Sequence, residues 1–236
     1  MFTQVMPRQA FLPTALNGCV LWLDADDEST ITDITGDISQ WDDKSPAGNN
    51  VTQGTLADQP DTGVDTQNGK NVTTWTGGTA TGDRMIRTSM SQTVEHIFAV
   101  VSVDAAPATT AGLCSNGSDR GNIRISGTTA EWRPDNGTNP GDGNDFCSGG
   151  AQADFTVDLQ PVATFTFDQY QMIHADRGPS ISNPGDVYTN LSVGGDPVGG
   201  GRFMSMKLAE LIMYNRTLTN GEINRVQGYL KNKWAV

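Results

Sequence analysis

The sequence predicts an all-β sandwich that ends in a single α-helix. Short apolar segments recur between clusters of Gly, Pro, Asn and Asp, which is the pattern of strands joined by turns. Asp outnumbers Glu by 22 to 5, and short Asp, Asn, Ser and Thr side chains favour turns over helix interiors. A capped, periodic helical segment stands only near the C-terminal end. A length of 236 residues suits one sandwich, since such domains run to about 250 residues.

Each strand is predicted from an apolar segment bounded by turn residues. These segments are 19–24, 38–41, 72–75, 96–103, 122–125, 164–167, 170–175, 191–194 and 207–214. Segments 96–103 and 207–214 are almost continuously apolar, so we expect central strands that are covered on both faces. Trp22, Trp41 and Trp234 have apolar or alternating neighbours and are expected in the core, whereas Asp24, Asp42 and Asp43 are expected to bind turn amides.

The C-terminal helix is predicted from its cap and its apolar spacing. Thr219 and Glu222 have the spacing of a capping box, in which each side chain accepts a hydrogen bond from the backbone N–H of the other residue. Apolar residues then recur at helical spacing and form one stripe: Ile223, Val226, Leu230 and Trp234. We expect this stripe to pack on the sandwich.

The three cysteines match no metal-binding spacing. Cys19 adjoins the apolar segment 20–23 and is expected to be a buried thiol. Cys114 and Cys147 are expected to be free, because an odd number of cysteines without an export signal fits a reducing site of synthesis. A disulfide between Cys114 and Cys147 is the alternative.

Charge and hydropathy argue against two classes of partner. The net charge of −12 and the isoelectric point near 4.4 do not suit nucleic-acid binding, which needs a basic surface. The chain has no run of 18 apolar residues, so we expect no membrane insertion. The first residues lack the apolar stretch of a secretory signal, and we expect synthesis in the host cytoplasm without export.

Residues 1–16 depart from the sandwich pattern. They carry apolar side chains without a regular period, namely Phe2, Val5, Met6, Phe11 and Leu12. We expect them to form an arm that docks outside its own domain, on another protein or on a second copy. Packing along the single sandwich domain, residues 17–236, is the alternative. Residues 112–150 are rich in Gly, Asn and Asp and are expected to be mostly surface loop.

Both ends of the chain resemble one group of domains. GCVLWLDADDESTIT and ISQWDDKSPAGNNVTQ near the start, and LAELIMYNRTLTNGEINRVQGYLKNKWAV at the end, are similar to the opening and closing segments of the laminin-G and concanavalin A-like lectin/glucanase superfamily. The resemblance implies a concanavalin A-like jelly-roll sandwich of two antiparallel sheets with one C-terminal α-helix. Such domains serve as glycan-binding modules, adhesion modules, catalytic domains or virion components, so the fold does not decide the function.

The carboxylates lack the usual pattern of a glycan-cleaving enzyme. Glycosidases hold two carboxyl groups roughly 5–10 Å apart, and glucanases of this superfamily carry them on a Glu-x-Asp-x-Glu strand, which this chain lacks. Glu210 lies in a predicted strand without a partner. His96 and His174 lie in apolar strands without a nucleophile motif, so we expect them in the core or at strand edges. We therefore expect no catalytic residues.

Two binding sites are suggested by residue types in the middle of the chain. The Trp132 ring could stack on a sugar while Arg133, Asp135 and Asn136 bind its hydroxyls; burial of Trp132 under the loop is the alternative. Oxygen ligands of the kind that Ca²⁺ binds also cluster there: Asp142, Asn144 and Asp145. Their spacing is not that of the helix-loop-helix calcium site, so turns in a solvated loop are the alternative. We expect no other cofactor.

Three functions compete. We expect a non-catalytic structural or recognition protein on the surface of a phage virion, as a capsid decoration or a tail-associated protein. Its partners would be other virion proteins, further copies of itself, or host-surface polysaccharide. A single sandwich without a catalytic pattern, an acidic surface and an apolar arm fit this function. A bacterial carbohydrate-binding or adhesion module is the alternative, followed by a glycan-cleaving enzyme.

Overall fold

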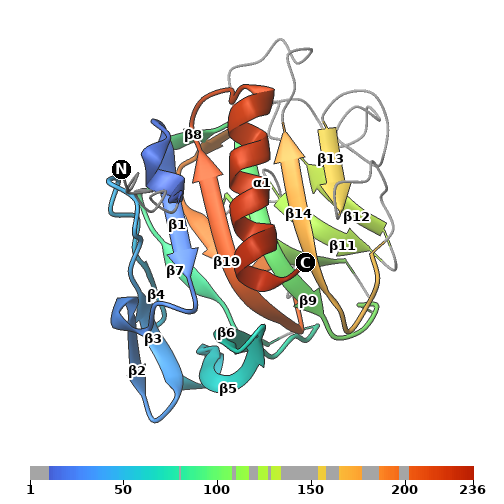
Figure 1. The fold of residues 1–236 in the computed structure, drawn as a ribbon. Helices are drawn as coiled ribbons and strands as arrows, with labels where there is room; N and C mark the ends of the chain where they lie inside the picture. The colour runs from blue at the N-terminus through green and yellow to red at the C-terminus, as the bar shows by residue number, and fades with distance from the viewer. Residues whose placement is uncertain are drawn as a thin grey trace, which may run out of the picture.

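The computed structural model describes residues 11–79, 81–107, 110–116, 122–126, 129–133, 154–157, 165–176, 186–196 and 202–236. Within them the chain forms antiparallel strands and one long helix, α1 (Asn220–Trp234), which crosses the outer face of the strands (Figure 1). This is the predicted jelly-roll-like β-sandwich with a C-terminal helix. Among the described residues, no helix has both the length and the apolar character needed to cross a membrane.

The front layer of the sandwich lies beneath α1. Its strands are β1 (Cys19–Asp24), β6 (Lys70–Trp75), β19 (Met206–Tyr214), β9 (His96–Val103), β14 (Tyr170–Asp176) and β13 (Asp154–Val157). β19 is central, since β9 pairs with one of its edges while β1 and β6 share the other. Every residue of β9 is buried, which confirms the prediction of a strand covered on both faces.

The back layer closes the sandwich on the other side. Its strands are β3 (Asp37–Trp41) with β2 (Ile31–Ile34), β4 (Val51–Thr52), β7 (Met85–Arg87), β16 (Leu191–Val193), β10 (Ala111–Ser115), β11 (Asn122–Ser126) and β12 (Thr129–Arg133). β5 (Asp61–Gln67) pairs with both β3 and β6 and so joins the layers. The two predicted sheets are therefore halves of one curled antiparallel sheet.

Shorter elements complete the described part. Two ribbons pair β8 (Gln92–Val94) with β15 (Asp186–Tyr188), and β17 (Gly195–Asp196) with β18 (Arg202–Phe203). Three 3₁₀ turns are η1 (Pro13–Ala15), η2 (Glu28–Thr30) and η3 (Leu56–Asp58).

The front layer separates two apolar cores. Alternate residues of β9, such as Ile97 and Ala99, face the back layer and pack with Trp41. Phe98 and Val100 face the other way and pack under α1. The helix supplies Val226, Leu230 and Trp234, all fully buried, as its apolar stripe predicts. Trp22 and Trp41 are buried as well, which confirms the expectation for the tryptophans.

The prediction of a strand over residues 164–167 is wrong for residues 165–167, which are the residues of this segment that the structure describes. Residues 165–169 are a loop, in which Phe165 is buried and Phe167 packs against the core between the layers. Their alternating apolar pattern reflects a loop that covers the sandwich edge. Within residues 112–150, the strand predicted over 122–125 is confirmed as β11, whereas β12 and most of β10 are strands that were expected to be loop.

The N-terminus of α1 has the predicted capping box. Thr219 Oγ1 accepts a hydrogen bond from the Glu222 backbone N–H at 3.3 Å, and Glu222 Oε2 accepts one from the Thr219 N–H at 2.8 Å. Arg216 donates to both carboxylate oxygens of Glu222, at 2.5 and 3.1 Å. The Arg216 guanidinium and the Thr219 N–H together hold the pKa of Glu222 at about 2.

Gly228 lies in the middle of α1, where glycine normally weakens a helix. Nothing lies within 4 Å of a Cβ built at this position. We expect Gly228→Ala to raise the free energy of unfolding by about 0.5–1 kcal/mol, because alanine restricts the unfolded chain and suits a helix. Urea unfolding would measure this effect, with Gly221→Ala in the first turn as the control of smaller gain. A destabilised Gly228→Ala protein would contradict the open space seen there.

Candidate functional site

A buried carboxylate, Glu210, fixes the last turn of α1 to the front layer. Trp22 Nε1 donates to Glu210 Oε1 at 2.6 Å, and Trp234 Nε1 donates to Oε2 at 2.7 Å. Lys233 Nζ lies 3.2 Å from Oε2 and also pairs with Asp24. Burial, together with the charge of Asp24, raises the pKa of Glu210, although Lys233 and the two indoles oppose the shift. We call Trp22, Asp24, Glu210, Lys233 and Trp234 the Glu210 cluster.

A β-bulge aims Glu210 at the helix. Leu208 pairs with Val101 of β9 and Glu210 pairs with Val100, so Ala209 is an extra residue in β19. Side chains normally alternate along a strand, but a bulge places two neighbours on one side. Ala209 packs in the core under α1, and Glu210 beside it reaches the indoles of that same core. In the sequence, residues 206–214 have the pattern of an ordinary apolar strand. That pattern does not indicate that Glu210 lies beneath the helix.

Asp24 extends the cluster toward the surface. Lys44 Nζ lies 2.8 Å from Asp24 and 2.7 Å from Asp27, and it stands 4.3 Å from the Trp22 ring centre. Burial would lower the pKa of Lys44, but the hydrogen bonds to Asp24 and Asp27 outweigh it and raise that pKa. Asp24 accepts one turn amide, from Asp26, at 3.2 Å, so the prediction that it binds turn amides holds only in part.

The turn after β3 uses carboxylates as the sequence predicts. Asp43 accepts backbone N–H groups of Trp22, Ser45 and Asn49 at 2.7–2.8 Å. Asp42 instead accepts the side-chain amides of Gln40 and Asn50, so the prediction that it binds turn amides is wrong for Asp42. These acidic groups therefore hold the fold.

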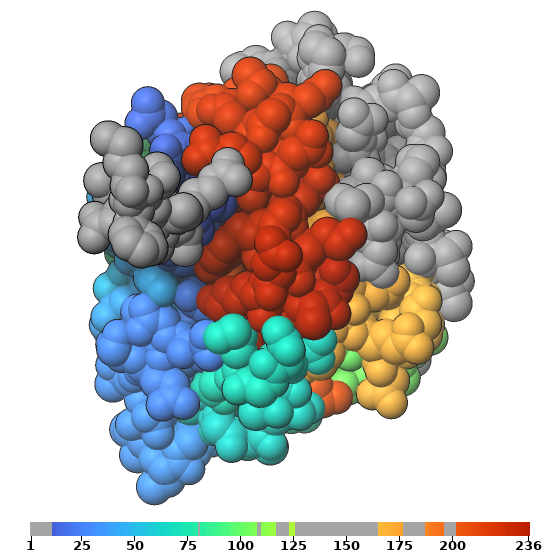
Figure 2. Space-filling model, viewed as in Figure 1, coloured from blue at the N-terminus to red at the C-terminus, as the bar shows by residue number. Residues whose placement is uncertain are grey.

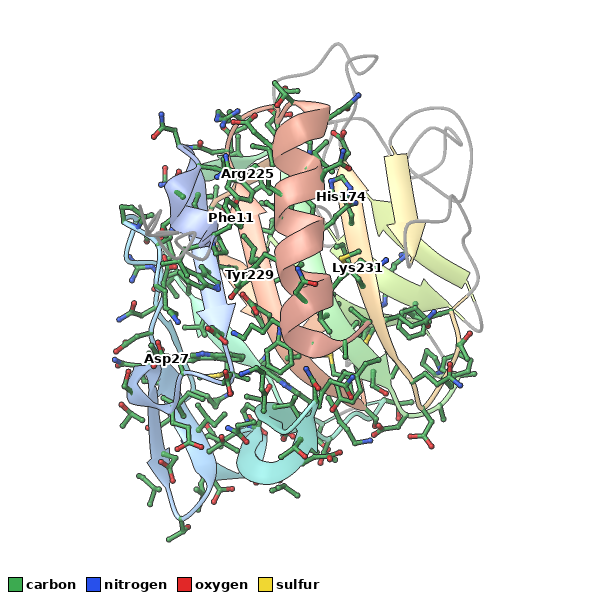
Figure 3. The ribbon with its side chains drawn as sticks, in the orientation of Figure 1. Phe11, Asp27, His174, Arg225, Tyr229 and Lys231 are labelled. Carbon is green, nitrogen blue, oxygen red and sulfur yellow. The ribbon has the colours of Figure 1, made fainter. Side chains whose placement is uncertain are left out.

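A groove of about 920 Å³ runs along α1 beside the Glu210 cluster. One wall consists of residues 11, 12, 14 and 15, and the other consists of α1 residues Asn224, Arg225, Gly228, Tyr229, Asn232 and Lys233. The Phe11 ring meets the Tyr229 ring edge-on at 6.1 Å, and the Arg225 guanidinium lies 4.6 Å over Phe11 (Figure 3). The groove thus offers aromatic faces, amides and cations along one helix edge.

The described end of the N-terminal arm contacts the domain itself. Phe11 packs against the core under α1, Leu16 is buried, and the Tyr214 hydroxyl donates to the Pro13 carbonyl at 3.0 Å. Leu12 is 45% exposed. Phe2, Val5 and Met6 lie outside the described residues, and docking of the arm on a partner stays a prediction.

A second, polar pocket of about 490 Å³ holds three aspartates. Asp37 and Asp61 face each other across β3 and β5, and Asp83 lines the same pocket. Burial raises the pKa of Asp83 to about 6, although the Thr76 N–H donates to it at 2.5 Å. Burial and the charge of Asp37 also raise the pKa of Asp61. Asp83 can therefore keep a proton close to neutral pH.

Two buried histidines meet beneath the N-terminal half of α1, although they are far apart in the sequence. His96 Nδ1 lies 3.2 Å from His174 Nε2, and the rings are stacked. The Leu218 N–H donates to His96 Nε2 at 2.9 Å, so in neutral His96 the proton sits on Nδ1 and points to His174. His174 Nδ1 lies 3.4 Å from the side-chain amide nitrogen of Gln227. Their core positions confirm the prediction, whereas their pairing was not foreseen.

Burial lowers the pKa of both histidines, to about 4 for His96 and about 3 for His174. For His96, the carboxylates of Glu95 and Glu222 oppose the shift and Arg216 adds to it. The charge of His96 lowers the pKa of His174 further. Both rings are therefore neutral at physiological pH.

His96, His174 and Asp176 are close enough to hold a metal ion, since their ligand atoms lie within 4.8 Å of one another. A histidine that binds a metal through one ring nitrogen normally donates a hydrogen bond from the other. His96 Nε2 instead accepts the Leu218 N–H, which leaves Nδ1 protonated and unable to bind a cation. The hydrogen bonds therefore favour an ordered histidine pair over a metal centre.

The predicted glycan and calcium residues fall mostly outside the described part of the chain. Trp132 and Arg133 belong to β12, which pairs with β11 at the edge of the back layer. Asp135 and Asn136, and also Asp142, Asn144 and Asp145, lie outside the described residues. Both sites stay predictions.

The described cysteines are buried free thiols, Cys19 and Cys114. Burial raises the pKa of each to about 12, so neither is reactive as a thiolate at neutral pH. This confirms the prediction for Cys19 and for Cys114; Cys147 lies outside the described residues.

Comparisons with known proteins give a likeness of fold only. No family profile and no curated protein matches the chain. Solved structures similar to it include Trypanosoma rangeli sialidase with sialic acid, at 14% identity and a TM-score of 0.48 over 93% of this chain and 34% of that chain. The same enzyme in complex with 2,3-difluorosialic acid, as a covalent intermediate, is 16% identical, with a TM-score of 0.49 over 98% of this chain and 36% of that chain.

The chain therefore spans about a third of the length of these structures. Similarity at this level gives the chain neither a family nor an activity. Nothing in the comparisons supports a phage virion role, which rests on the resemblance of the chain ends.

Proposed function

We propose that the chain is a non-catalytic structural or recognition module of a phage particle. The observation that supports the non-catalytic part is the use made of Asp24 and Glu210. These carboxylates face each other across β1 and β19, but Asp24 is paired with Lys44 and Lys233. Glu210 is fully buried and accepts hydrogen bonds from the indoles of Trp22 and Trp234. A general acid must come within hydrogen-bond reach of the group that it protonates. We therefore assign Asp24 and Glu210 a role in stabilising the fold.

The recognition part is supported by the groove along α1. Aromatic rings, amides and an exposed guanidinium there offer a surface for a partner. The virion part is supported by the chain ends, which resemble domains that include virion components.

Electron microscopy of purified particles tests the proposal. We expect density with this fold on the capsid or tail surface, and its loss from particles made without the gene. Particles that lack the chain while infected cells contain it would contradict a virion role.

A glycan-cleaving function is the second candidate because of the pocket that holds Asp37, Asp61 and Asp83. A carboxyl group with a pKa of about 6 beside carboxylates is the arrangement of a general acid and its partner. Glycosidases use such pairs.

We expect no release of reducing ends from β-glucans, galactans or host-surface polysaccharides. The reason is that the described chain holds no Glu-x-Asp-x-Glu strand, and Asp83 is only 6% exposed. A reducing-sugar assay measures this. Turnover that disappears in Asp83→Asn, while Asp168→Asn on the surface keeps it, would favour the enzyme.

A further inference from the structure

We propose that the groove along α1 binds an acidic, extended segment of another protein. This deepens the proposed function, on which it rests, by stating what kind of partner the module recognises. Four features of the groove carry the inference: an opening in its wall, a preorganised cation, two amides spaced along the helix, and a helix edge without acidic residues in an acidic chain.

The opening is at Gly228. Glycine in a helix interior costs stability, and nothing within 4 Å of a built Cβ explains it by packing. Gly228 lines the groove between Arg225 and Tyr229. The lack of a side chain lets another polypeptide approach the helix backbone closely, which is a common reason for glycine at a binding surface.

The preorganised cation is Arg225. Its guanidinium is held over the Phe11 ring at 4.6 Å, and its side chain is exposed. No carboxylate in the described part of the chain forms an ion pair with it. A stacked guanidinium keeps its planar edge free to bind a carboxylate through two hydrogen bonds. Arg225 therefore selects an acidic side chain.

The amides of Asn224 and Asn232 suit an extended backbone. They lie eight residues apart on the same helix, a rise of about 12 Å. That distance matches about four residues of an extended chain. Between them, Phe11 and Tyr229 supply an apolar surface for a side chain that points inward.

The charge of the groove distinguishes between three possible occupants: the chain's own N-terminal arm, a second copy of the chain, and a different protein. Two cations of α1 line the groove, Arg225 and Lys233, and Lys233 is already paired with Asp24 and Glu210, which leaves Arg225 to bind an acid. After Glu222, α1 has no acidic residue, although the chain has a net charge of −12. Residues 1–10 contain Arg8 and no acid, so the chain's own arm lacks the matching charge. Two copies of the chain repel each other through their net charge. An acidic segment of a different protein carries the matching charge and need not bring a second net charge of this size with it. Figure 2 shows the outer surface of α1.

Binding of short peptides tests the inference. The probes are acetylated nonapeptides that combine Glu with Leu, with matched peptides that carry Gln in place of Glu, measured by isothermal titration calorimetry. We expect the acidic peptides to bind at least tenfold more tightly than their matched controls. Arg225→Gln should weaken binding at least tenfold. Lys231→Gln, which removes the same charge from the opposite edge of α1 (Figure 3), should change it less than twofold.

Gly228→Leu supplies a second test. It should abolish binding while circular dichroism and the melting temperature show a folded domain. Binding unaffected by Arg225→Gln and Gly228→Leu, or no binding at 1 mM peptide, would overturn the inference. Tighter binding of polygalacturonate than of the peptides, lost in Arg225→Gln, would overturn it in favour of an anionic glycan, and self-association lost in Gly228→Leu would overturn it in favour of a second copy. These outcomes are independent of whether particles contain the chain.

Discussion

Glu210→Ala is expected to lower the free energy of unfolding by about 3–5 kcal/mol. Breaking a buried ion pair leaves its partners without compensation. Here the indole N–H groups of Trp22 and Trp234 would lose their acceptor, and Lys233 would keep only Asp24 as a counter-charge. Because these groups tie α1 to β1 and β19, we expect the helix to loosen as well. Urea unfolding at pH 7, followed by tryptophan fluorescence, measures the effect directly.

Two variants sharpen this measurement. Glu28→Ala removes a carboxylate at an exposed position and should change stability by less than about 0.5 kcal/mol. Glu210→Gln keeps one hydrogen-bond acceptor, so its free energy of unfolding should lie between those of Glu210→Ala and the parent protein. If Glu210→Ala were no less stable than Glu28→Ala, the buried cluster would not hold the helix.

Stability is also expected to respond to acid through the histidine pair. Burial lowers the pKa of His96 from 6.5 to about 4, and that of His174 to about 3. Between pH 6.5 and the lowered pKa of each histidine, the ring binds a proton in the unfolded chain but not in the folded chain. Acidification therefore favours unfolding. The stabilisation is therefore complete above about pH 6.5 and is lost as the pH falls toward 4. At about 1.4 kcal/mol per pKa unit, His96 alone contributes on the order of 3 kcal/mol.

Comparison of variants isolates this contribution, since buried carboxyl groups act in the opposite direction. Burial raises the pKa of Asp83 to about 6, so Asp83 stabilises the fold as the pH falls through that value. His96→Gln keeps an acceptor for the Leu218 N–H and a donor for His174, but it cannot titrate. We expect its melting temperature to depend less on pH between 7 and 4 than that of the parent protein. Parallel pH curves for the two proteins would refute the assignment.

The sequence predicts those parts of the fold whose signals are local. The capping box at Thr219 and the apolar run 96–103 each depend on neighbours within a few residues, and both match the structure. Residues 165–167 show where such signals fail, because a loop that covers a core has the same alternation as a strand. The single curled sheet depends on β5, whose residues are polar and half-exposed and so resemble a loop.

The candidate site was less predictable because its parts meet only in three dimensions. Glu210 appears isolated in the sequence, yet the bulge at Ala209 turns it toward Trp22, which is 188 residues away. His96 and His174 are separated by 78 residues and meet across β9 and β14. Gly228 is a local signal of the groove, since glycine inside a helical pattern lowers the stability of the helix and leaves room for another backbone to approach.

The position of β19 bears on how the chain folds as it is made. β19 is the hydrogen-bonded neighbour of β1, β6 and β9, yet its residues are synthesised after all three of these strands. At a rate of about 5–20 residues per second, β1 waits roughly 10–40 s for Tyr214, the partner of Cys19. During that time the apolar edges of β1 and β9 lack their main partner and are open to aggregation. The nascent chain should therefore need a chaperone until β19 and α1 emerge, and pulse-labelled chains stopped before residue 206 should co-purify with one.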